Sequence, residues 1–225
     1  MVATFLDLTG ACSVGIANTV TPVGWLTAGH ASPSSQYANA DLLVGNRVAE
    51  LAGQETPWRM RKDMDRLVVV DCEATGPCPG FGELTEFGAV AVATSRSFHG
   101  VLADARPHPA RPVYSEIVGA RFDPLPIFRA FAAWLQQEVA QPPVFVSDNP
   151  AYDFPWISHG FFTTLGCNPF GHSARRIGDF HAGLLGDFDA PQTWKHLRQT
   201  PHDHHPVHDA QGNAEALRRL LNGER

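Results

Sequence analysis

Two runs of apolar residues in the middle of the chain have the length of β-strands. The first covers residues 66–72 and the second covers residues 84–92. Both are almost continuously apolar, which is typical of strands covered on both faces of a sheet. Residues 97–103 predict a third strand and residues 144–146 a short fourth strand. The prolines at positions 107, 109 and 112 predict a break after the third strand.

Apolar residues recur at helical spacing in two other segments. Residues 125–139 predict an amphipathic helix that packs on the sheet. Pro206 suits the first turn of another helix, which we expect to extend to Leu221. The expected inner positions are Phe128, Phe131, Ala132 and Leu135 in the first helix, and Val207, Ala210, Ala214, Leu217 and Leu221 in the second.

A further helix is expected directly after the fourth strand. Asn149 favours the N-cap position and Pro150 the first helical position. Alternatively, Asp153 caps a helix that begins at Phe154. In both cases the helix ends before Gly166. Strands that alternate with helices place the chain in the α/β class.

The pattern divides the chain near residue 63. Residues 1–63 are rich in Gly, Ser, Thr and Ala and show little sustained periodicity, so we expect an irregular N-terminal extension of uncertain structure. Residues 64–225 carry the strand and helix patterns and form the expected folded domain. Met60 and Met64 stand just before the first strand and raise the hypothesis that translation begins there.

Two short motifs in the N-terminal extension have a resemblance of their own. Cys12–Gly15 and residues 24–30, with the sequence GWLTAGH, are similar to the segment around the catalytic histidine of bacterial chymotrypsin-like serine peptidases. Ala31 stands where that family usually has a cysteine, and the sequence contains no GDSGG-type motif. Because a catalytic triad needs nucleophile, base and acid together, a serine-peptidase fragment is only a remote alternative.

Acidic residues occur in three separated patches near the ends of predicted strands and helices. Asp71 and Glu73 close the first strand, Asp153 lies near the start of one helix, and Asp209 lies in the first turn of another. Hard ions such as Mg²⁺ prefer carboxylate oxygens. Two such ions about 3.5 to 4 Å apart can generate hydroxide and stabilise both the attacking and the leaving oxygen of a phosphodiester. The pattern therefore predicts a two-metal phosphodiesterase, with the side chain of Cys72 on the opposite, buried face.

Histidines near the last acidic patch offer a general base. His204 precedes the Asp209 helix and has an unperturbed pKa of about 6.5, near working pH. His205 and His208 compete for this role, although His208 should point about 100° away from Asp209 around the helix. Together with His202, these histidines could instead bind zinc, but the sequence offers no closed-site spacing with cysteine partners.

Composition adds restrictions on size, location and partners. The 225 residues are 44% hydrophobic and 18% charged, which is sufficient for one core plus an extension. No apolar run reaches the length of a membrane span and the start lacks a basic signal region, so we expect a cytoplasmic protein without a membrane partner. The net charge of −6 is unfavourable for binding nucleic acid unless cations neutralise the acidic patches. The candidates for contacts to flanking phosphates are Arg175, Arg176, Lys195 and Arg198.

Four motifs carry a family resemblance that spans roughly residues 66–221. They are Asp71-x-Glu73-x-Thr75-Gly76, Glu86-Phe87-Gly88-Ala89-Val90, Asn149-x-Ala151-Tyr152-Asp153 and His204-x-x-x-x-Asp209-Ala210. In this order they resemble the DEDDh branch of the 3′-5′ exonucleases with a ribonuclease H-like fold. That group includes proofreading exonucleases, oligoribonuclease and ribonuclease T.

The resemblance implies a mixed five-stranded sheet flanked by helices, and two Mg²⁺ or Mn²⁺ ions. The implied metal ligands are Asp71, Glu73, Asp153 and Asp209, the implied general base is His204, and the implied substrate-binding residues are Thr75, Gly76 and Asn149. A proline-rich turn at residues 77–80 departs from the family pattern near the expected 3′-end pocket. A sibling branch uses a tyrosine base four residues before the last aspartate, where this chain has His205, so the choice between His204 and His205 stays open.

These observations predict a metal-dependent 3′-5′ exonuclease. The expected substrate is the 3′ end of single-stranded nucleic acid, with RNA slightly favoured over DNA because the domain is compact and lacks polymerase or helicase segments. A non-catalytic nucleic-acid-binding protein on the same fold is the alternative. The resemblance also raises the expectation of a homodimer.

Overall fold

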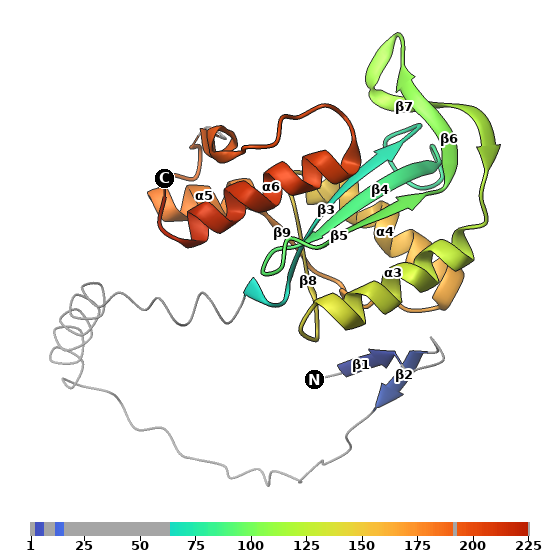
Figure 1. Ribbon diagram of the computed structural model, residues 1–225, viewed down its shortest axis with the longest axis horizontal. Coiled ribbons are helices and arrows are strands. Elements are labelled where there is room, and N and C mark those ends of the chain that lie inside the picture. The colour runs from blue at the N-terminus through green and yellow to red at the C-terminus, as the bar shows by residue number, and fades with distance from the viewer. Residues whose placement is uncertain (1–2, 7–11, 16–63, 191–192, 225) are drawn as a thin grey trace, which may run out of the picture.

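A mixed five-stranded sheet forms the centre of the domain. The computed structural model describes residues 3–6, 12–15, 64–190 and 193–224 (Figure 1). The strands of the central sheet, in spatial order, are β5 (Ser97–Val101), β4 (Leu84–Ala91), β3 (Leu67–Ala74), β8 (Val144–Ser147) and β9 (Ala174–Arg176). β3, β4 and β5 pair antiparallel, whereas β3, β8 and β9 pair parallel. The predicted fold class is confirmed.

Helices cover both faces of the sheet (Figure 1). On one face lie α3 (Pro124–Glu138) and α4 (Pro150–Leu165), and on the other lie α5 (Ile177–Leu185), the 3₁₀ helix η1 (Thr193–Leu197) and α6 (Pro206–Leu221). Successive side chains of β3 enter the two cores in turn, because a strand alternates its side chains between faces. Val70 and Cys72 pack on the α3 and α4 side and Val69 on the α6 side. This confirms the prediction for Cys72.

The helices agree with the sequence pattern except at a few positions. All four expected inner residues of α3 are buried. In α6, Ala210, Ala214 and Leu217 are buried, whereas Val207 and Leu221 are only half-buried. Leu220 takes the last inner position in place of Leu221, since the observed stripe follows a helical period of 3.6 residues.

The start of α4 decides between the two alternatives for this helix. α4 begins at Pro150 and carries Asp153 in its first turn, so a helix that begins at Phe154 is wrong. Asn149 occupies the N-cap position, but its side chain makes no capping hydrogen bond. Gly166 ends the helix in the left-handed conformation, as expected from its freedom to adopt a φ of 75°.

The predicted break at the prolines is wrong. β6 (Ala103–His108) and β7 (Arg111–Arg121) pair antiparallel as a separate two-stranded sheet, with Pro107 and Pro112 inside the strands. Each strand of a two-stranded sheet has one unpaired edge, where a missing N–H group is tolerated. The third predicted strand also ends early, at Val101.

The N-terminal residues contribute a second small sheet. β1 (Ala3–Leu6) pairs antiparallel with β2 (Cys12–Gly15). The peptidase-like motif at residues 24–30 and Met60 lie outside the described residues, and the domain boundary at residue 63 stays a prediction. In the part of the chain that the structure describes, no helix has the length and apolar character needed to cross a membrane.

A glycine in β4 fixes the position of α6. Gly88 pairs with Asp71 in the sheet, and a Cβ atom at Gly88 would lie 2.3 Å from the carbonyl oxygen of Pro206. We expect Gly88→Ala to lower the free energy of unfolding by about 1 to 3 kcal/mol, because α6 would have to move away from the sheet. Gly183→Ala is the matched control, since no atom lies within 4 Å of its added Cβ. Equal denaturation midpoints for the two variants would contradict this account.

Candidate active site

Three of the predicted carboxylates converge at the end of β3. Asp71, Glu73 and Asp209 each place an oxygen within 4.8 Å of the others. Asp71 and Glu73 are two residues apart on a strand, so both side chains leave the same face of the sheet. α6 packs on that face and brings Asp209, which is 1% exposed, to the pair. Such an all-oxygen donor set fits a hard divalent cation.

Asp153 lies beside this group without being part of it. Its carboxylate is buried, and Oδ1 accepts a hydrogen bond of 3.1 Å from the backbone N–H of Cys72. Its negative charge is close enough to raise the pKa of both Asp71 and Glu73. The fourth predicted ligand is therefore adjacent to the other three and faces the same strand end.

Burial and the closeness of the acidic residues raise the pKa values of three carboxyl groups. Burial, and after it the charges of Asp153, Asp209 and Glu73, hold the pKa of Asp71 well above its usual value. Burial has the largest effect on Glu73 and the negative charge of Glu86 the second largest, and together they raise its pKa to about 8. Burial also raises the pKa of Asp153 to about 7. Ionised carboxylates repel one another here, so bound cations would stabilise the ionised site.

The two candidate bases have different surroundings. His204 Nδ1 lies 3.9 Å from Glu73 Oε1, and the backbone of His204 has a φ of 62°. A non-glycine residue in this conformation is strained, which is common at functional sites. His205 instead stacks on His208, with ring centroids 4.2 Å apart, and contacts His99 at 5.1 Å. Of the two candidates, His204 is thus the one beside the carboxylates.

His202, which the sequence interpretation named only as a possible zinc ligand, contacts the carboxylate of Asp209. Its Nδ1 lies 2.7 Å from Asp209 Oδ2. His202, His204 and Asp209 form a second group whose donor atoms lie within 4.8 Å of one another. This group shares Asp209 with the three-carboxylate group and supplies only three ligands, so it does not make the closed four-ligand site of a structural zinc.

The predicted substrate-binding residues lie at the same edge of the sheet. Thr75 closes a turn, since its N–H donates to Glu83 O and its Oγ1 accepts from Glu83 N–H, both at 2.9 Å. Gly76 lies so close to the carbonyl of Phe81 that a Cβ would come within 2.1 Å of the oxygen. Asn149 is exposed and lies two residues after the end of β8, which runs parallel to β3. All three positions therefore follow the carboxyl ends of neighbouring strands.

Arg198 is the cation in direct contact with the carboxylates. Its Nη2 lies 3.0 Å from Asp209 Oδ1, and its side chain is only 9% exposed. Gly212 makes this possible, because a Cβ there would lie 2.5 Å from Arg198 Nε. Arg175 and Arg176 donate to the backbone oxygens of Ala174 and Asp148, and their role as phosphate contacts stays a prediction.

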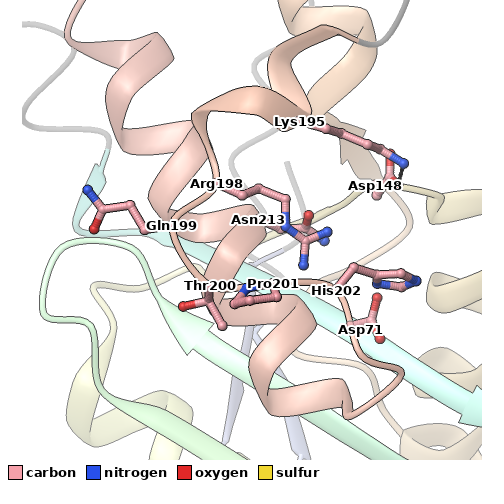
Figure 2. A pocket seen from close by; sticks show the side chains of 9 residues that line it. All are labelled: Asp71, Asp148, Lys195, Arg198, Gln199, Thr200, Pro201, His202 and Asn213. Atoms are coloured by element: carbon pink, nitrogen blue, oxygen red, sulfur yellow. Dashed lines mark ion pairs between the residues drawn. The ribbon is translucent and has the colours of Figure 1, made fainter.

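A cavity of about 400 Å³ adjoins the carboxylates (Figure 2). Figure 2 shows Arg198 and Asn213 side by side in its middle, with His202 and Asp71 at one end and Lys195 and Asp148 at the other. The remaining lining residues are Gln199, Thr200 and Pro201. The cavity is thus bounded by the η1–α6 connection and by β3.

Comparison with known proteins finds similarity to a nuclease. No family model matches the sequence. The chain is 29% identical over 180 residues to the 3′-5′ DNA exonuclease Cap18 of Escherichia coli, in an alignment that covers 71% of this chain and 93% of that protein. This similarity supports a 3′-5′ exonuclease of the DEDDh type. Among solved structures it is similar to the zinc-bound form of the E. coli ExoI–ssDNA complex, with a TM-score of 0.41 and 14% identity, over 69% of this chain and 39% of that chain.

The raised carboxyl pKa values predict how the stability of the metal-free exonuclease depends on pH. Between the ordinary pKa of Glu73, 4.5, and its folded value of about 8, the folded state binds more protons than the unfolded state. Stability is therefore lost as pH rises through this window, by a few kcal/mol in order of magnitude between pH 5 and pH 8. Denaturation midpoints in EDTA at several pH values would measure the loss.

Two variants separate the contribution of Glu73 to this loss of stability from the contributions of other carboxyl groups. Glu73→Gln removes one of the groups with a raised pKa and should make the loss of stability with pH smaller, whereas Glu83→Gln, at an exposed carboxyl, should leave it unchanged. A wild-type protein equally stable at pH 5 and pH 8 would refute the argument.

Proposed function

We propose that this protein removes nucleotides from the 3′ end of single-stranded DNA with two Mg²⁺ or Mn²⁺ ions. The convergence of Asp71, Glu73 and Asp209 within 4.8 Å carries the proposal, because bound divalent cations would stabilise three ionised carboxylates at this spacing. The similarity to a protein named a 3′-5′ DNA exonuclease supports DNA as the substrate. The slight preference for RNA that the sequence predicts is the alternative.

Each site residue then has a role in hydrolysis. Asp71, Glu73 and Asp209 would hold the cations, with Asp153 as the fourth ligand fixed by the amide of Cys72. When bound, the cations supply Lewis acidity and lower the pKa of a coordinated water. The imidazole of His204 would accept the proton of the attacking water, as its place beside Glu73 allows.

Substrate binding would use the strand ends beyond the carboxylates. The turn that Thr75 closes is held by two hydrogen bonds and a close glycine contact, so it offers a rigid surface for the terminal nucleotide. Asn149 has an exposed side chain that the helix does not use. A homodimer and a cytoplasmic location stay predictions of the sequence.

The proposal is tested with matched deoxyribo- and ribo-oligonucleotides that carry a 5′ label. We expect Mg²⁺ or Mn²⁺ to shorten the deoxyribo-oligonucleotide stepwise from its 3′ end, EDTA to prevent this, and a circular single strand to resist. Faster loss of the ribo-oligonucleotide would replace DNA by RNA as the substrate. Binding of either strand without cleavage in Mn²⁺ would support the non-catalytic alternative.

A further inference from the structure

We propose that Arg198 is a positioning residue with two alternative partners. It holds Asp209 when no metal ion is bound, and it turns to the amide oxygen of Asn213 when the carboxylates bind cations. This inference rests on the proposed function, because it assumes that Asp71, Glu73 and Asp209 bind divalent ions. It gives a partner to a buried acceptor, Asn213 Oδ1, that the roles in hydrolysis leave unexplained.

Arg198 is the positive charge that faces Asp209. Its Nη2 donates to Asp209 Oδ1 at 3.0 Å, and the two side chains are 9% and 1% exposed. Burial holds the pKa of Asp71 high, and the positive charge of Arg198 acts against this effect. A guanidinium at this position therefore lowers the free energy of bringing the carboxylates together before a metal ion binds.

The same contact opposes the binding of a metal ion. Asp209 is one of the three residues whose oxygens lie within 4.8 Å of one another, so a cation bound to this group would lie close to the guanidinium. Like charges at short distance in a buried site repel one another strongly. Cation binding is therefore more favourable if Arg198 leaves Asp209 for another acceptor.

Asn213 offers that acceptor. It follows Asp209 by four residues on α6, so the two side chains lie on the same face of the helix. Asn213 is 2% exposed, and its Oδ1 makes no hydrogen bond to any described residue. Buried acceptors normally have donors, so this oxygen calls for an N–H group. Because the amide is neutral, it binds Arg198 less strongly than ionised Asp209 does, and Arg198 stays on Asp209 until a cation competes for it.

Arg198 carries a matching donor. Its Nε is buried and makes no hydrogen bond within the described part of the chain. Figure 2 shows the guanidinium beside Asn213 in the cavity of about 400 Å³. A Cβ at Gly212 would lie 2.5 Å from Arg198 Nε, so this glycine leaves α6 open to the guanidinium between the two acceptors. A rotation of the Arg198 side chain would thus exchange one acceptor for the other.

Calorimetric titration with Mn²⁺ in the absence of nucleic acid tests the exchange without cleavage. Asn213→Leu keeps the approximate volume and removes the acceptor, so an Arg198 side chain displaced from Asp209 finds no partner there. We expect about a fivefold loss of Mn²⁺ affinity. Gln199→Leu is the matched control, because it removes another amide from the lining of the same cavity. It should change the affinity by less than about twofold.

The Arg198→Met background shows whether the arginine causes this loss. In that background Asn213→Leu should change the Mn²⁺ affinity by less than about twofold, since no guanidinium needs the amide oxygen. Equal effects of Asn213→Leu and Gln199→Leu, or the same loss with and without Arg198, would overturn the proposal. Thermal midpoints in EDTA report whether each variant is folded.

A crystal structure of the wild-type protein with Mn²⁺ tests the proposal without any variant. We expect an N–H group of Arg198 at about 2.9 Å from Asn213 Oδ1 and none bonded to Asp209 Oδ1. Bound Mn²⁺ with Arg198 still on Asp209 would refute the exchange and leave the proposed function intact. Absence of Mn²⁺ from the carboxylates would contradict the proposed function and this inference together, so the two failures are distinct.

Discussion

Asp71→Asn is expected to reduce the rate of 3′-end cleavage by about a thousandfold or more. The substitution keeps the size of the side chain but removes the charge that Asp71 contributes to the three-carboxylate group. Loss of cation-mediated stabilisation of the transition state is worth several kcal/mol, and each 1.4 kcal/mol is about a factor of ten in rate. Initial rates on a labelled oligodeoxynucleotide at saturating Mn²⁺ would measure the effect.

Asp65→Asn is the matched control for this prediction. Asp65 is an exposed aspartate just before the opposite end of β3, where it is remote from the carboxylates. Its amide variant should retain the wild-type rate. An Asp71→Asn protein that keeps more than about a tenth of the wild-type rate would be incompatible with the two-cation mechanism.

Asp209→Ala is expected to destabilise the protein by about 3 to 5 kcal/mol in the absence of metal. The substitution removes the partner of Arg198, whose side chain is 9% exposed, and leaves a buried charge unpaired. Asp71→Asn leaves that ion pair intact and relieves repulsion among the acids, so it should not lower the stability of the metal-free protein. Urea denaturation in EDTA would compare the two.

A double variant tests the cause of this loss. Asp209→Ala combined with Arg198→Met removes both charges and should recover much of the stability, since no unpaired charge remains. If the losses of the two single variants instead add in the double variant, the Arg198–Asp209 pair does not account for the destabilisation. Cleavage should be absent in both Asp209 variants, which separates stability from activity.

The sequence by itself determined the order of the main elements and most of the candidate site. Continuous apolar runs predicted β3 and β4 because strands covered on both faces have no polar side, and the helical period of apolar residues predicted α3 and α6 almost to the residue. Asp71 and Glu73 could be paired because residues two apart on a strand share a face. These are local properties, which a single segment carries without its neighbours.

The tertiary structure decided the features that depend on contacts between distant segments. The β6–β7 pair tolerates its prolines only because each strand has a free edge, and Asp153 turns to the amide of Cys72, which is 81 positions away in the sequence. Arg198 reaches Asp209 only because Gly212 leaves space on α6. Spacing along the chain contains no information about such packing. The sequence therefore predicted which acids gather, whereas the fold determined which cations face them.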